Sequence, residues 1–195
     1  MSIPIPPRPN GYRIGLGNAL IQTEVFVDIE CPFSKRAWET LQKVVAGWGE
    51  QVAFTAVPTV LCDHRQSWDL TKAATLVADG EPERFWRFFS YLYERQSSFS
   101  AEAFKQKSQL DLHNLISEFI EDFSELPDRA YLLKKLASEQ LEKQAKHSVR
   151  YAIARGIWST PTFLINGAKA DSLDSSATVS DWQTLLDSLL RQDEN

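Results

Sequence analysis

The pattern of apolar and polar positions predicts a strand, a helix and a second strand at the start of the chain. Segment 18–29 ends in Val25-Phe26-Val27-Asp28-Ile29, whose apolar side chains fall on both faces of a strand. A strand buried on both sides is typical of a parallel sheet. Apolar residues at helical spacing follow over 32–48, and 51–57 is a second strand stopped by Pro58. This β-α-β order implies a right-handed crossover between parallel strands.

The middle of the chain is helical by the same criterion. Apolar residues at helical spacing predict helices over 68–79, 82–93, 101–107, around 112–119 and over 127–155. Ser100 can cap the third of these helices, and Ser138 can divide the last one by capping a new start. A long helical block therefore follows the second strand and separates it from the last part of the chain.

The last part of the chain returns to strands. A strand is expected over 162–165, and the Asn166-Gly167 pair that follows is a strong signal for a tight hairpin turn. The return strand over 169–173 is weak. Segment 180–183 has the pattern of a capping box that opens a final amphipathic helix. The order is thus β-α-β, a helical block, then β-β-α.

The chemistry is concentrated in Cys31-Pro32-Phe33-Ser34, at the junction of the first strand and the first helix. A cysteine there faces unpaired backbone N–H groups and the positive end of the helix dipole. Both favour the thiolate, so we expect Cys31 to be a nucleophile near neutral pH. Pro32 suits the first helical position, and the Ser34 hydroxyl, one turn later, is expected to reach the sulfur.

Composition narrows the class of protein. The 195 residues are 43% apolar with a net charge of −5, which supports one packed α/β domain and argues against a nucleic-acid partner. No apolar run has the length of a membrane span, so no membrane partner is expected. We assign 1–18 to an extended Pro-rich arm and 19–195 to the domain, with a helical insertion at about 63–150. Without a signal peptide in this sequence, a cytoplasmic or other soluble intracellular location is expected.

Two segments resemble the thioredoxin superfamily. They are 27–34, which contains Cys31-Pro32-Phe33-Ser34, and 156–167, which contains Ser159-Thr160-Pro161-Thr162. The helical block between the strands looks like the DsbA-like branch of thiol–disulfide oxidoreductases. The resemblance covers roughly 20–190. It implies a thioredoxin-like α/β fold with a helical insertion between the second and third core strands. It also implies a cis Thr160-Pro161 bond beside Cys31, with Thr160 presenting its backbone to an extended substrate.

Two departures from the family pattern shape the expected function. Ser34 stands where the family has its resolving cysteine, and Val25 stands where many thioredoxins keep a buried acid. Asp28 and Glu30 are expected at the exposed end of the strand. We therefore predict a thiol–disulfide oxidoreductase-like protein that acts through one nucleophilic cysteine, by mixed-disulfide, isomerase or glutathione-linked chemistry.

Other residues leave alternatives open. Cys62 is either a resolving thiol that pairs with Cys31 or a small buried apolar residue. Phe33 and Trp158 either line a substrate groove or pack in the core. The cluster of Cys62, Asp63 and His64 has poor spacing for zinc, so a surface loop and no metal site are expected. His113 and His147 are expected to face solvent.

Two other functions remain compatible with the pattern. Kappa-class glutathione transferases and the related isomerases insert helices into the same fold and carry a Ser-Pro-aromatic-Ser site, from which this chain differs in the first residue. A non-catalytic thioredoxin-fold binding protein is the third candidate. We expect no required cofactor, and glutathione is the one small molecule that could take part in the reaction. The expected partner is a protein or small-molecule thiol or disulfide, and the oligomeric state is left open.

Overall fold

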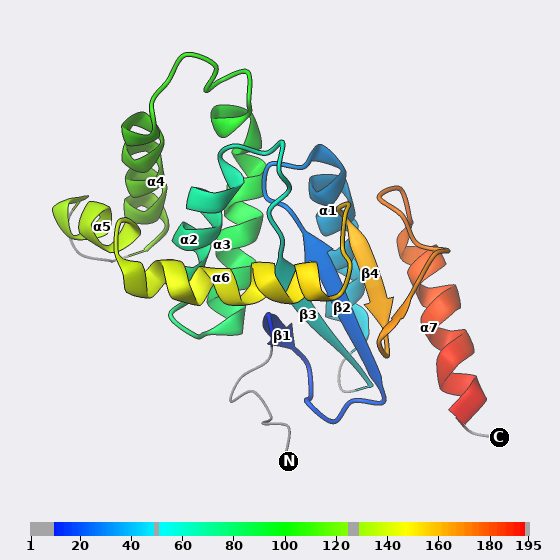
Figure 1. The fold of residues 1–195 in the computed structure, drawn as a ribbon. Helices are drawn as coiled ribbons and strands as arrows, with labels where there is room; N and C mark the ends of the chain where they lie inside the picture. Colours follow the sequence, from blue (N-terminus) through cyan, green and yellow to red (C-terminus); the bar gives the residue numbers. More distant parts are fainter. Residues whose placement is uncertain (1–9, 49–50, 125–128, 194–195) are drawn as a thin grey trace.

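The computed structural model describes residues 10–48, 51–124 and 129–193, which form a five-stranded sheet with helices on both faces (Figure 1). The strands are β1 (Tyr12–Ile14), β2 (Ile21–Val27), β3 (Val52–Pro58), β4 (Thr162–Ile165) and β5 (Ala168–Lys169). Their order across the sheet is β1-β3-β2-β4-β5. The pair β2 and β3 is parallel and the other neighbours are antiparallel. The predicted parallel β-α-β unit is confirmed.

The helices follow the predicted order. They are α1 (Pro32–Trp48), α2 (Ser67–Ala78), α3 (Pro82–Glu94), α4 (Gln109–Phe123), α5 (Arg129–Leu136), α6 (Glu139–Ala154) and α7 (Val179–Asp193), with a short 3-10 helix η1 (Gln96–Phe99) after α3. All helices from α2 to α6 lie between β3 and β4 in sequence. The predicted α/β fold with a helical insertion is therefore confirmed.

The central strand β2 shows why the sheet is covered on both faces. Val25 and Val27 belong to the main core, whereas Phe26 packs in a smaller cluster with Ala152 of α6. Side chains alternate between the faces of a strand, so a strand with apolar residues at consecutive positions needs a cover on each side. Helix α6 supplies the second cover by running from the helical block across the sheet (Figure 1).

Three local expectations are corrected. Strand β1 lies within the 1–18 arm and pairs with β3, so this part of the arm belongs to the sheet, while 1–9 lie outside the described residues. Segment 101–106 forms turns instead of a helix. The last helix is capped by Thr178, whose hydroxyl accepts from the Asp181 N–H at 3.2 Å while the Asp181 carboxylate accepts from the Thr178 N–H at 2.7 Å.

Other predicted boundaries hold. Ser138 caps α6 by accepting from the Leu141 N–H, and thus separates α5 from α6. The residues Asn166 and Gly167 both have positive φ, of 48° and 83°, as the tight turn between β4 and β5 requires. No helix among the described residues is long and apolar enough to cross a membrane.

The core between α1 and α3 is built from aromatic rings. Trp38 of α1 is 1% exposed and stacks on Trp86 with ring centroids 4.5 Å apart. Its indole N–H donates to the Ser90 hydroxyl at 2.9 Å, so its polar atom is satisfied despite burial. This contact attaches the helix that carries the cysteine motif to the helical insertion.

We predict that Trp38→Ala lowers the free energy of unfolding by about 3–5 kcal/mol, because it removes a fully buried ring and leaves a cavity. Urea unfolding followed by circular dichroism measures the change. Trp158→Ala is the matched control, since that ring is 85% exposed and its loss should change stability by less than about 0.5 kcal/mol. Equal effects of the two changes would contradict this account of the core.

Candidate active site

Cys31 lies directly before α1, at the carboxyl end of β2, and its side chain is only 3% exposed. Its thiol donates to the backbone carbonyl of Thr160 at 3.3 Å, across 129 residues of sequence. The Thr160–Pro161 peptide bond is cis. The antiparallel pairing of β2 with β4 places Phe26 opposite Thr162, which brings the start of β4 next to the end of β2. Sheet topology thus brings the two motifs together.

Backbone hydrogen bonds fix the turn that carries the cysteine. The Cys31 N–H donates to the Asp28 carbonyl at 3.2 Å, and the Cys31 carbonyl accepts from the Lys35 N–H at 3.1 Å. The Gln96 amide, from η1, donates to the carbonyls of Ile29 and Cys31 at 2.9 and 3.1 Å. The sulfur therefore sits at a rigid helix start, where unpaired N–H groups and the helix dipole favour negative charge.

Ser34, at the position of the missing second cysteine, is fully buried. Its hydroxyl accepts from the Asp28 N–H at 3.3 Å and is also hydrogen-bonded to Tyr93. The Tyr93 hydroxyl donates to the Asp28 carbonyl at 3.0 Å, and burial raises the pKa of Tyr93 well above its ordinary value. Among the described residues, the hydrogen bonds of Ser34 thus go to Asp28 and Tyr93, not to the sulfur of Cys31.

Asp28 is the centre of a buried polar network. Its carboxylate accepts from the N–H groups of Glu30 and Leu61 at 2.9 and 2.8 Å and from the Ser67 hydroxyl, and it pairs with His64 Nδ1 at 3.0 Å. The carboxylate has no exposed surface. The expectation that Asp28 lies at the exposed end of the strand is therefore wrong, because the loop before α2 covers it.

The same correction applies to Glu30, which is 7% exposed. Its carboxylate accepts from the Gln66 N–H at 3.0 Å. Burial raises the pKa of Glu30, and the hydrogen bond from Gln66 and the charge of His64 partly oppose the rise. Two acids thus flank the cysteine turn from within the protein.

Cys62 and Asp63 are exposed, as expected for a surface loop, whereas His64 in the same loop is half-buried and belongs to this network. Its hydrogen bond to Asp28 raises its pKa to about 9, against an opposing effect of burial. Cys62, two residues earlier, is exposed, and both Cys31 and Cys62 are free thiols. The structure therefore rules out the reading of Cys62 as a buried apolar residue. Within the described ranges, no group of three or more His, Cys, Asp or Glu residues could hold a metal ion.

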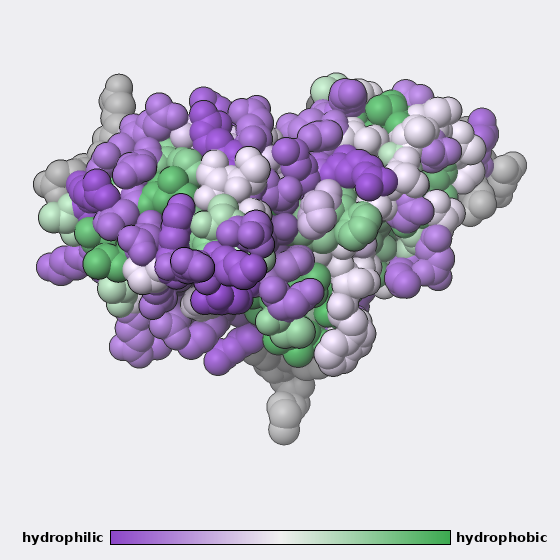
Figure 2. Space-filling model, turned by 90° about the horizontal axis from the view of Figure 1, so that it is seen from above, coloured by the Kyte–Doolittle hydropathy of each residue, from purple (hydrophilic) through white to green (hydrophobic). Residues whose placement is uncertain are grey.

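Two aromatic side chains of the sequence-predicted site are exposed. Trp158 is 85% exposed and Phe33 is 53% exposed, so neither packs in the core. The Arg36 guanidinium lies 5.7 Å from the centre of the Phe33 ring. Pro32 is exposed at the first position of α1. Figure 2, which views the molecule from above this end of the sheet, shows apolar patches between polar side chains.

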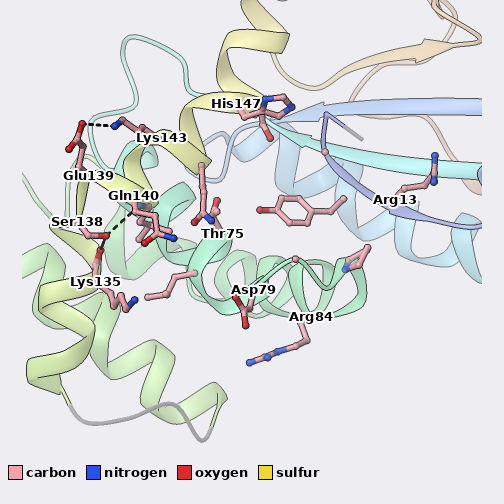
Figure 3. A pocket seen from close by; sticks show the side chains of 18 of the residues that line it. Arg13, Thr75, Asp79, Arg84, Lys135, Ser138, Glu139, Gln140, Lys143 and His147 are labelled. Carbon is pink, nitrogen blue, oxygen red and sulfur yellow. Dashed lines mark hydrogen bonds and ion pairs between the residues drawn. The ribbon is translucent and has the colours of Figure 1, made fainter. Parts of the chain in front are cut away.

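A large cavity lies apart from these residues. Its volume is about 1160 Å³, and β1, α2, α3, α5 and α6 contribute to its walls (Figure 3). His147 is exposed at this cavity, as expected for a solvent-facing residue. His113 is not solvent-facing: its Nε2 pairs with the buried Asp69 carboxylate at 3.2 Å. None of the lining residues belongs to the cysteine site, so the cavity and Cys31 lie in separate parts of the described structure.

The polar network around Asp28 is the part of the site that the sequence does not reveal. Leu61, His64 and Ser67 lie 33 to 39 residues from Asp28, and only the parallel pairing of β2 with β3 brings them to the same edge. One signal was available: parallel strands end at the same edge of a sheet, so the segment after 51–57 had to approach the residues after 18–29.

Comparisons with known proteins agree with this geometry. The family model described as thioredoxin matches residues 8–188. A structure provisionally assigned as a protein-disulfide isomerase from Pseudomonas syringae is 28% identical, with a TM-score of 0.72, and covers 90% of this chain and 97% of its own. Oxidised BdbD from Bacillus subtilis is 18% identical, with a TM-score of 0.75, over 93% and 94% of the two chains. DsbA from Chlamydia trachomatis is 16% identical, with a TM-score of 0.68, over 99% and 100%. A search of curated proteins found no match.

We predict a pH-dependent stability that depends on His64. Since the pKa of His64 is raised in the fold, its pair with Asp28 stabilises fully below the ordinary value of 6.5, and the stabilisation is lost as the pH rises through about 9. The free energy of unfolding in urea should fall across this window in the wild type. The fall should be smaller in His64→Gln, which cannot titrate.

His147→Gln is the matched control, since His147 is an exposed histidine on α6. It should leave the pH dependence as in the wild type. A wild-type profile that stays flat up to pH 9 would show that the pair of His64 and Asp28 does not stabilise the fold.

Proposed function

This chain belongs to the thioredoxin family, and on that premise we propose that it catalyses thiol–disulfide exchange through a single nucleophilic cysteine, Cys31. The observation that carries the proposal is the position of the sulfur. It lies at the start of α1 and 3.3 Å from the carbonyl of Thr160, which precedes a cis proline. The nucleophile and the backbone of the residue before the cis proline, to which we assign substrate binding, therefore lie next to each other.

The proposed reaction begins with the thiolate of Cys31. The thiol releases its proton to solvent, and the thiolate attacks one sulfur of a substrate disulfide. A new S–S bond joins Cys31 to that sulfur, the old S–S bond breaks, and the other substrate sulfur leaves as a thiolate. The products are a mixed disulfide and a substrate thiol, so no external oxidant is needed for this step.

The second half of the cycle requires a thiol that Ser34 cannot provide. A thiolate of the substrate itself, or glutathione, attacks the mixed disulfide and releases Cys31 as a thiolate. The first route rearranges disulfides. The second leaves the substrate sulfur bonded to glutathione, and a second glutathione thiolate then releases the reduced substrate and glutathione disulfide. Either route uses one protein cysteine, and in each exchange step one disulfide forms for each one that breaks.

Cys62 is the other thiol considered for this second step. It is exposed and free, and it follows Leu61, whose N–H is bound to the Asp28 carboxylate. This anchor holds the start of the Cys62 loop beside the turn of Cys31. The role of Cys62 is separable by experiment, because serine can replace an exposed cysteine with little effect on the fold.

The exposed aromatic residues support a peptide as the substrate. Trp158 lies two residues before Thr160, and Phe33 lies two residues after Cys31. Both rings offer apolar contact area, without a deep pocket, to an extended peptide that pairs with the Thr160 backbone. The structural relative from Pseudomonas syringae, which is described as a protein-disulfide isomerase, is consistent with a protein substrate.

We predict that Cys31 forms a mixed disulfide with glutathione, and that Ser34→Cys raises the rate of peptide oxidation or of insulin reduction. The added thiol would attack the mixed disulfide, release the substrate as a thiolate and leave a disulfide between positions 31 and 34. The release step then needs no glutathione, and the dithiol reductant of the insulin assay or the disulfide oxidant of the peptide assay regenerates the protein. Mass spectrometry of the adduct and a turnover assay without glutathione give the measurements. Cys31→Ala is the negative control and should abolish both signals.

Two results would change the proposal. Efficient wild-type turnover without glutathione that is lost in Cys62→Ser would identify Cys62 as the resolving thiol. The absence of an adduct in both the wild type and Ser34→Cys would reject exchange chemistry in favour of a binding protein.

A further prediction concerns Trp158. Trp158→Ala should raise KM for a peptide disulfide by about fivefold or more and leave kcat nearly unchanged, because the ring contacts the substrate away from the reacting sulfur. Leu110→Ala, which removes a 61% exposed apolar side chain on α4, is the control. An equal change in both variants would exclude a specific contact with Trp158.

A further inference from the structure

We propose that His64, held by Asp28, supplies the positive charge that allows Cys31 to carry a thiolate in its buried position. The inference deepens the proposed function, since it identifies the group that activates the same sulfur. His64 acts through electrostatics and position and forms no bond to the substrate. The sequence motif around Cys31 gives no indication of it, because His64 belongs to the loop between β3 and α2.

The first argument is the environment of the sulfur, in which several groups disfavour a thiolate. Cys31 is 3% exposed, so ionisation must overcome the loss of water. The Thr160 carbonyl oxygen accepts a hydrogen bond from the thiol. Because this oxygen carries partial negative charge, it would repel a thiolate in the same position. The carboxylate of Asp28, three residues away and fully buried, adds like-charge repulsion. The helix start stabilises the thiolate against these effects, and we infer that a neighbouring cation supplies the rest of the stabilisation.

The second argument is that one residue positions both the histidine and the cysteine. Asp28 accepts from the Cys31 N–H through its backbone carbonyl at 3.2 Å, and its carboxylate pairs with His64 Nδ1 at 3.0 Å. Because Nδ1 lies within ion-pair distance of Asp28, this side of the imidazole ring is held against the carboxylate and Nε2 lies on the opposite side of the ring. The charge of His64 thus neutralises Asp28 at the base of the cysteine turn.

The third argument is that the loop cannot carry His64 away without breaking several contacts. The Thr59 N–H donates to the Val27 carbonyl at 2.9 Å, the Leu61 N–H to Asp28 at 2.8 Å and the Gln66 N–H to Glu30 at 3.0 Å. Both ends of the segment that contains His64 are therefore attached to the residues just before Cys31. The side chain of His64 is 18% exposed, so its charge is only partly screened by water.

The electrostatic surroundings support a cation at neutral pH. The charged and titratable groups that act on His64 are Asp28, Asp63, Cys31 and, across the loop, Glu30. The hydrogen bond to Asp28 contributes most to a pKa of about 9, and the charge of Cys31 raises the pKa as well. Since coupling between two sites is reciprocal, a thiolate that stabilises the imidazolium is stabilised by it to the same extent.

The test is a pH titration of thiolate ultraviolet absorbance in a Cys62→Ser background, with the Cys31→Ala protein subtracted. His64→Gln keeps a hydrogen-bond donor for Asp28 but removes the charge, and His64→Lys keeps both a donor and the charge. Arg65→Gln is the matched control, because it removes an exposed cation from the adjacent position. His64→Gln should raise the midpoint by about one pH unit, which is about a tenfold decrease in the ratio of thiolate to thiol at a given pH.

His64→Lys should restore the wild-type midpoint, and Arg65→Gln should leave it unchanged. A wild-type midpoint in His64→Gln together with a raised midpoint in His64→Lys would show that His64 acts only as a structural hydrogen-bond donor. That result would overturn the proposal. If His64→Gln does not fold, histidine NMR in proteins that keep His64 decides the question. Cys31→Ala should then lower the pKa of His64, and an unchanged value would reject the coupling.

The test separates this inference from the proposed function, because thiolate absorbance needs no substrate. A midpoint that depends on His64 in a protein that forms no glutathione adduct would reject the exchange activity alone. An adduct that forms at the same rate and the same pH in the wild type and His64→Gln would reject the role of His64 alone.

Discussion

The arrangement of the site depends on one buried charge, the carboxylate of Asp28. A carboxylate without exposed surface is stable only when donors surround it, and here they come from Glu30 on its own turn and from Leu61, His64 and Ser67 on the loop before α2. The backbone of Asp28 in turn binds the cysteine turn through the Cys31 N–H. The position of the sulfur is therefore a consequence of satisfying this charge, and any change at Asp28 acts on the nucleophile and on the loop together.

The sheet explains how a long helical insertion is compatible with a compact site. Helices α2 to α6 separate β3 from β4 in sequence, yet β4 pairs directly with β2. Helix α6 covers the face of β2 that carries Phe26 and ends at Ala154, and Gly156, with a φ of +69°, turns the chain just after it. The chain is thereby delivered to Thr160 beside the cysteine. The insertion serves both as cover for the sheet and as the route that brings the second motif to the first.

The sequence was informative where a signal is local. The β-α-β unit, the helix start at Cys31 and the Asn166-Gly167 turn each depend on residues close together in sequence, and the structure contains all three. It was uninformative where a polar residue has distant partners. An acid after a strand is expected to be exposed until the loop 59–67 is known to cover it, and a histidine in that loop is expected to face solvent until Asp28 is known to bind it. Burial of charge is a tertiary property, so no spacing rule reveals it.

The serine at position 34 gains a physical meaning from this network. Its hydroxyl is fully buried and accepts from the Asp28 N–H while it contacts Tyr93. A thiol is a weaker acceptor than a hydroxyl, so serine holds the backbone of Asp28 more firmly than cysteine would. The residue that removes the resolving thiol thus strengthens the turn that positions the remaining one. A fixed turn, a paired histidine and one sulfur suit a nucleophile whose partner thiol arrives with the substrate or from solution, because no motion within the turn is needed to complete the exchange.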